Sequence, residues 1–120
     1  SYVDGSRIGE ISGAVLNDRK IMANDGILVI IANINIENRK LLGKPMITTR
    51  GFILINENEE LINKIEKVAT KSIIKELKNK TATYQDIKQE LTKDVSTFIK
   101  TETGRKPIVL PIISNIKIEK

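Results

Sequence analysis

The spacing of apolar residues changes twice along this chain, and that change restricts the folds it can adopt. From Ile27 to Ile36, β-branched residues run almost unbroken and then alternate with Asn, as in a central strand whose far end reaches water. Glu37 to Arg39 is expected to make a turn. The chain then returns from Lys40, where Gly43 and Pro45 interrupt the strand pattern and Met46 to Ile55 resumes it. These residues therefore predict a pair of neighbouring strands.

Two helices are predicted in the middle of the chain, where apolar residues recur every three or four positions. The first spans about Glu59 to Lys78 and carries an apolar sector almost opposite a stripe of lysines. The second spans about Tyr84 to Lys100 and is expected to begin at a capping box formed by Thr83 and Asp86. The expected buried faces are Leu61, Ile62, Ile65, Val68, Ala69, Ile73 and Leu77 in the first helix, and Tyr84, Ile87, Leu91, Val95 and Phe98 in the second.

The stretch from Gly104 to Lys120 is either a solvated basic tail or a third strand. Pro107 suits the first residue of a strand, and Pro111, which has no N–H to donate, favours an edge strand. On this prediction Val109 and Ile113 point away from the helices, and the opposite row faces them. That row has an apolar residue at almost every second position, which favours the strand: Ile108, Leu110, Ile112, Ile116 and Ile118.

The predicted fold class is therefore α+β. Two helices cover one face of a small, three-stranded, mostly antiparallel sheet in a two-layer sandwich, with the order β-β-α-α-β. A chain of 120 residues has room for one such domain. No apolar run approaches the roughly 20 residues that span a bilayer. A cytoplasmic protein with no membrane partner is the expectation.

The absence of two residue types narrows the possible chemistry. The chain has no His and no Cys, so it lacks the usual general base, a thiolate nucleophile and the common zinc ligands. Asp4, Glu10 and Asp18 supply carboxylates near the N-terminus, but they do not follow a calcium-loop pattern. We therefore expect no enzyme from this chain by itself, and we predict no catalytic, cofactor-binding or metal-binding residue.

The charge of the chain leaves two readings open. Its net charge of +5 is compatible with RNA binding and equally with an ordinary solvated surface. The arginine and lysine before the third strand could meet RNA or pair with acidic groups. The candidate RNA contacts are Lys64, Lys67, Lys71, Lys75 and Lys78 on the first predicted helix, with Arg105 and Lys106 before the third strand.

Four motifs in collinear order resemble a known family. They are "VDG" at Val3 to Gly5, "VLNDRKIMANDGILVI" from Val15 to Ile30, "TRGF" at Thr49 to Phe52, and "RKPIVLPII" from Arg105 to Ile113. Together they are similar to the C-terminal end of bacterial ribonuclease J. Members of this family are zinc-dependent metallo-β-lactamase-type nucleases with a β-CASP insertion, which act on RNA as 5′ exonucleases and endonucleases.

The resemblance implies a domain without its own catalytic centre. The zinc-binding His and Asp motifs of the family belong to its catalytic core, and none maps onto a chain without His. Residues 1–19 would be a linker from that core, and residues 20–120 a single C-terminal domain. Arg7 and Ser12 stand where many members have Gly, which is similar to the less active paralogue found beside the main enzyme in some bacteria.

Two functions follow as expectations. The first is a non-catalytic domain of a ribonuclease J-like enzyme that promotes self-association, adjoins the catalytic core of the same polypeptide and contacts RNA. Its interface is expected on the uncovered face of the sheet, at Val109 and Ile113, because apolar residues there would otherwise meet water. The alternative is a free-standing basic RNA-binding module that uses the lysine stripe of the first helix.

Overall fold

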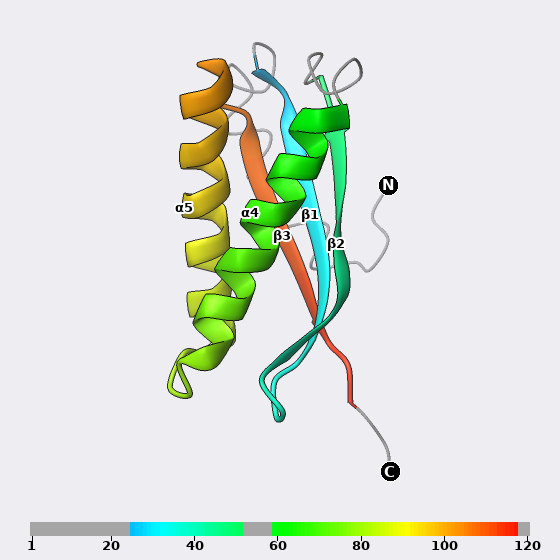
Figure 1. Ribbon diagram of the computed structural model, residues 1–120, viewed down its shortest axis with the longest axis vertical. Helices are drawn as coiled ribbons and strands as arrows, with labels where there is room; N and C mark the ends of the chain where they lie inside the picture. Colours follow the sequence, from blue (N-terminus) through cyan, green and yellow to red (C-terminus); the bar gives the residue numbers. More distant parts are fainter. Residues whose placement is uncertain (1–24, 52–58, 118–120) are drawn as a thin grey trace, which may run out of the picture.

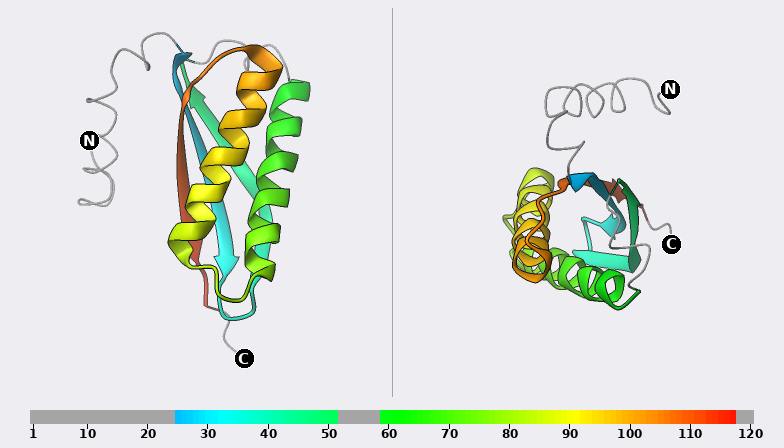
Figure 2. Two further views of the ribbon diagram at one scale, coloured as in Figure 1. Left: turned by 90° about the vertical axis from the view of Figure 1, so that its left-hand side faces the viewer. Right: turned by 90° about the horizontal axis from the view of Figure 1, so that it is seen from above.

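The computed structural model describes residues 25–51 and 59–117. All three strands form one sheet, and both helices lie on the same side of it (Figures 1 and 2). The predicted α+β sandwich with the order β-β-α-α-β is confirmed. Its elements are β1 (Ile27–Asn35), β2 (Lys40–Arg50), α4 (Glu59–Lys78), α5 (Tyr84–Thr103) and β3 (Ile108–Asn115). The predicted linker, the end of the return strand after Gly51, and Ile118 lie outside the described residues.

The central position of β1 is confirmed by the strand order β2-β1-β3. β2 pairs with β1 antiparallel, and β3 pairs with β1 parallel. The chain reverses direction at β2, at α4 and at α5, so β3 starts at the same end of the domain as β1 (Figure 1). The sheet is therefore mixed, and its antiparallel pairing is confined to the β1–β2 hairpin.

The hairpin contains an irregularity where the sequence pattern was interrupted. Ile31 pairs with Met46, but Asn33 pairs with Leu42, so residues 43–45 of β2 lie opposite the single residue Ala32. Gly43 adopts a φ of +75°, which a residue without a Cβ tolerates best. The strand thus continues through this bulge, at the predicted interruption, as one element from Lys40 to Arg50.

The core lies between the helices and one face of the sheet. Alternate residues of β1 are buried there, and both helices contribute a stripe at helical spacing. Most of the buried helix positions are those the sequence predicted, although Tyr84 and Phe98 are only partly buried and Ile99 is fully buried. The core residues of these elements are Leu28, Ile30, Ala32, Ile34, Leu61, Ile65, Ala69, Ile73, Leu77, Ile87, Leu91, Val95 and Ile99.

The prediction for the faces of β3 is wrong. Val109 and Ile113 are only 7% and 1% exposed and belong to the core. Their parallel register places Val109 beside Leu28 and Ile113 beside Ala32, on the face that the helices cover. Both rows of this strand are apolar, so its alternation could not show which row faces inward. The row at Ile108, Leu110 and Ile112 faces the other way and is partly exposed.

The ends of α5 follow the expected chemistry. The Thr83 side chain accepts a hydrogen bond from the Asp86 N–H at 3.1 Å, and the Asp86 carboxylate accepts one from the Thr83 N–H at 2.8 Å. The predicted capping box is therefore confirmed. At the other end Gly104, with a φ of +74°, donates its N–H to the Lys100 carbonyl. The helix consequently continues past Lys100 to Thr103.

Candidate interaction surfaces

The lysine stripe of α4 is exposed but is not a uniform basic face. The Lys64 Nζ lies 3.7 Å from the Glu102 carboxylate, and the Lys75 Nζ lies 3.5 Å from the Asp94 carboxylate, so two lysines pair with α5. Such exposed pairs contribute little stability, but they reduce the positive charge along the stripe. Three lysines make no ion pair within the described part of the chain: Lys67, Lys71 and Lys78.

Arg105 and Lys106 both contact one carboxylate at the start of β1. Arg105 Nη1 lies 3.8 Å from Asp25 Oδ1, and the Lys106 main-chain N–H donates to Asp25 Oδ2 at 2.9 Å. This contact between segments far apart in the sequence joins the entrances of β1 and β3. Of the two alternatives for Arg105, pairing with an acidic group is the one found. The Lys106 side chain remains exposed.

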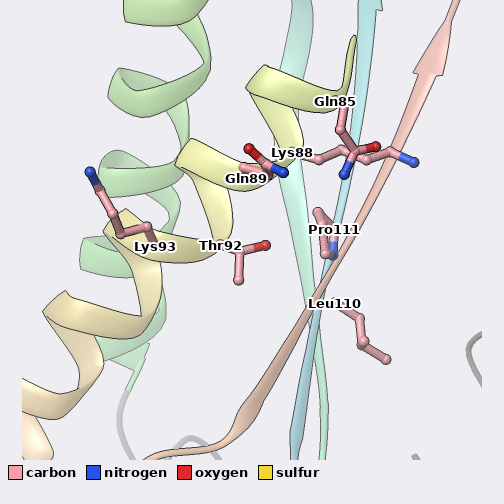
Figure 3. Close-up of a pocket in the computed structure, with 7 residues that line it drawn as sticks. All are labelled: Gln85, Lys88, Gln89, Thr92, Lys93, Leu110 and Pro111. Atoms are coloured by element: carbon pink, nitrogen blue, oxygen red, sulfur yellow. The ribbon is translucent and has the colours of Figure 1, made fainter. Parts of the chain in front are cut away.

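Two hollows lie side by side between α5 and β3, and we call them together the α5–β3 groove. The larger hollow has a volume of about 560 Å³ and the smaller one about 320 Å³. In the larger hollow the side chains of Gln85, Lys88 and Thr92 extend from α5 towards β3, whereas Lys93 extends to the opposite side (Figure 3). The groove is lined by Gln85, Lys88, Gln89, Thr92, Lys93, Leu110 and Pro111, and by Ser96, Thr97, Lys100, Lys106 and Pro107.

The other face of the sheet, turned away from the helices, is the open face. From Ile27 to Ile31 and from Ile108 to Ile112 its β1 and β3 members are aliphatic and partly exposed, and Met46 on β2 is 61% exposed. The polar pair Asn33–Ser114 follows at the far end of these two strands. The open face holds a single charged residue in these rows, Arg50. Three rows of paired residues cross it: Arg50–Ile27–Ile108, Thr48–Val29–Leu110 and Met46–Ile31–Ile112.

Within residues 25–51 and 59–117, no three His, Cys, Asp or Glu side chains gather closely enough to hold a metal ion. Among the same residues, neither helix is long and apolar enough to cross a bilayer. Besides the α4 stripe, the α5–β3 groove and the open face, the described domain has a hollow of about 450 Å³ between β2 and α4.

Residues 14–116 match a family model described as the ribonuclease J C-terminal domain. The chain belongs to this family. The predicted resemblance is thus confirmed, and the match begins inside the segment 1–19 that was predicted to be a linker. Ribonuclease J is a family of nucleases, and the match is to its C-terminal domain.

Relatives named ribonuclease J 1 and ribonuclease J 2 both match the chain. The "Ribonuclease J 2" of Staphylococcus epidermidis is 32% identical over 114 residues, and the "Ribonuclease J 1" of Streptococcus pyogenes is 35% identical over 112 residues. These alignments cover 95% and 93% of this chain but 20% of each relative. The chain therefore spans about a fifth of the length of these relatives. The similar identities favour neither form of the enzyme.

Sequence reasoning overlooked the groove lysines on α5. Lys88 and Lys100 lie among acidic residues in the sequence, so no basic stripe is visible there. A helical projection would have shown that Lys88, Thr92, Ser96 and Lys100 follow one another at intervals of four and share one face. It could not have shown that this face borders β3, because that depends on the packing of the whole sheet.

Proposed function

We propose that this chain is a non-catalytic domain of a ribonuclease J-like enzyme that degrades or processes RNA, and that it promotes assembly by self-association through the open face. The observation that carries the proposal is the set of aliphatic residues on β1 and β3 that neither α4 nor α5 covers: Ile27, Val29, Ile31, Ile108, Leu110 and Ile112. Contiguous exposed apolar surface of this kind typically marks an interaction site.

Charge favours a second copy of the chain as the occupant of the open face. Two copies of a chain with a net charge of +5 repel each other. They approach most readily where each has the least charge, and the three rows of the open face contain only Arg50. By contrast, lysines dominate the α4 stripe and the α5–β3 groove. Contact between open faces would bury apolar area without bringing these lysines together.

Sedimentation velocity over a wide concentration range tests this proposal. We expect the chain to associate as its concentration rises, and we expect Met46→Lys combined with Ile112→Lys to remain monomeric. Met46 on β2 and Ile112 on β3 lie at the two ends of the row Met46–Ile31–Ile112 of the open face. The added lysines introduce like charges that the contact would desolvate. Both positions are at least partly exposed, so circular dichroism should show a folded variant.

Ile74→Lys is the matched control. Ile74 is 38% exposed on α4, away from the open face, so its substitution removes exposed apolar surface elsewhere and should leave association unchanged. A chain that stays monomeric at every concentration would contradict the proposal. In that case the rest of a longer polypeptide, such as a catalytic core, would be the occupant to examine.

RNA contact is the second proposed function, and the α5–β3 groove favours it. Every charged side chain that lines the groove is a lysine, whereas the α4 stripe is partly neutralised by α5 carboxylates. A groove of this charge suits a phosphate backbone. A free-standing RNA-binding module remains the alternative, and it predicts RNA binding by a chain that shows no self-association.

A further inference from the structure

We propose that the α5–β3 groove binds the phosphate backbone of single-stranded RNA. This inference rests on the proposed role of the domain in an RNA-processing enzyme and assigns the RNA contact to a particular surface. The sequence placed the main candidate RNA contacts on the α4 stripe, whereas this inference places them in the α5–β3 groove.

The packing of the two helices separates the charges of α5. Its acidic side chains Glu90, Asp94 and Glu102 pair with lysines of α4 at 3.5–3.8 Å. Lys88 and Lys100, on its other side, border the groove, and no carboxylate among the described residues lines it. The groove side of α5 therefore presents positive charge to a polyanion that could lie along the helix.

Three groove lysines are available to phosphates. Lys88, Lys100 and Lys106 make no ion pair with any described residue, while Lys93 lies 3.5 Å from Glu90 and extends away from β3 (Figure 3). The Lys88 Nζ is held 4.9 Å from the centre of the Tyr84 ring, near the start of α5. Lys88 and Lys100 are twelve positions apart, which is about 18 Å along a helix, so a strand lying in the groove would meet cations along its length.

Neutral donors lie between these lysines. They can donate to phosphate and sugar oxygens, which receive most hydrogen bonds from proteins that bind nucleic acids. The volumes of both hollows fall within the range of about 300–1,000 Å³ that holds small ligands, so each has room for a nucleotide. The donors are Gln85, Gln89, Thr92, Ser96 and Thr97.

The backbone of β3 argues against an extended peptide as the occupant. Ile108 and Ile116 donate their main-chain N–H groups to the carbonyls of Gly26 and Ile34. In this parallel pair the even-numbered residues of β3 therefore direct their main-chain N–H and C=O groups at β1, and the odd-numbered residues direct theirs at the free edge of the sheet. Pro111 occupies an outward position in the middle of the strand and has no N–H. A peptide adding to this edge would lack a hydrogen bond at its centre. A phosphate backbone needs no such ladder.

Fluorescence anisotropy with a labelled single-stranded oligouridine tests the proposal. The variant K88E/K100E/K106E should bind about tenfold or more weakly than the original chain. The slope of log affinity against log salt concentration should fall by about 2, because three phosphate contacts to a single strand are lost. Circular dichroism verifies the fold, which these exposed or partly exposed positions should tolerate.

The variant K67E/K71E/K78E is the matched control. It makes the same change in net charge on α4, with lysines that are also unpaired among the described residues, and it should lose less than about threefold in affinity. Equal losses in both variants would show that binding follows net charge alone, and would overturn the assignment. Absence of binding by the original chain at low salt would overturn it as well.

Two further measurements distinguish RNA binding in the groove from peptide binding there and from self-association through the open face. If an acidic peptide such as polyglutamate displaced the RNA from the groove at lower concentration than unlabelled oligouridine does, the groove would be a peptide site and the RNA assignment would fail. K88E/K100E/K106E and the control K67E/K71E/K78E should associate equally in sedimentation, because they carry the same net charge and both leave the open face unchanged. Failure of RNA binding and failure of self-association are therefore distinguishable.

Discussion

The Arg39 side chain joins the β1–β2 turn to the end of α4. Its guanidinium donates hydrogen bonds to main-chain carbonyls at the C-terminal end of that helix and in the loop that follows, a place where a cation is favourable. Arg39 itself adopts a φ of +56°. Its acceptors are the carbonyls of Glu76, Leu77, Asn79 and Ala82. One side chain therefore satisfies carbonyls that the helix leaves without intrahelical partners.

Arg39→Lys should lower the free energy of unfolding by about 1–3 kcal/mol, the range for losing hydrogen bonds to a charged donor. The lysine keeps the charge and the backbone, but its compact ammonium cannot reproduce the fork of the guanidinium. Urea unfolding at one fixed, low protein concentration measures the effect without a contribution from association. Lys40→Ala, next to it on the exposed side of β2, is the control and should change stability little.

Gly26 stands where three parts of the domain meet. It precedes β1, its carbonyl accepts the Ile108 N–H at 2.9 Å, and its φ is +83°. A Cβ at this position would contact the Arg50 carbonyl oxygen and lie 2.6 Å from the carbonyl carbon of Gly51. Gly26 therefore links the starts of β1 and β3 to the end of β2.

Gly26→Ala should therefore destabilise the fold more than Gly43→Ala does. Both glycines have positive φ, but a Cβ on Gly43 would meet nothing within 4 Å. Gly43→Ala should lower the free energy of unfolding by about 1 kcal/mol through backbone strain alone. Gly26→Ala should lower it further, because the new Cβ adds a steric clash to the same strain. Thermal unfolding of the two variants compares them directly. Equal losses would mean that the backbone around Gly26 moves aside.

Among the elements, α5 shows which features of a helix can be predicted from its local sequence. Its start and its apolar stripe were readable from residues close in sequence, because capping and periodicity are local effects. Its polar side was not readable in the same way. Glu90 and Asp94 pair with α4, whereas Lys88 borders β3, and this arrangement depends on neighbours that the helix acquires only in the fold.

Thr83→Ala should lower the stability of the domain by about 1 kcal/mol, as expected for loss of an N-cap. The substitution removes the hydroxyl that accepts from Asp86 and also breaks the reciprocal capping box. Thr97→Ala, at an exposed position inside the same helix, provides the comparison, and it should be neutral or slightly stabilising because Ala favours helix. Chemical denaturation at fixed concentration measures both variants.

At the scale of the whole molecule, the domain presents two surfaces of opposite character. The open face is apolar and nearly uncharged, and the α5–β3 groove is polar and basic. They adjoin at Leu110 of β3, which belongs to the open face and also lines the groove. The substitutions proposed for the two surfaces avoid Leu110, so those on one surface should leave the proposed role of the other intact.

The sequence by itself determined the elements, their order and the composition of the core. These depend on periodicity, turn residues and caps, which act over a few residues. It also indicated the family through its motifs, including "RKPIVLPII". It did not determine which row of β3 faces inward, because Val109 and Ile113 alternate with residues that are equally apolar.

Only the tertiary structure decided which residues form the surfaces. The parallel register of β3 against β1 placed Val109 in the core and Ile112 on the open face. The packing of α4 on α5 paired Lys64 and Lys75 with carboxylates and left Lys88 and Lys100 beside β3. Register and helix packing arise from contacts between residues far apart in the chain, so no local pattern contains them.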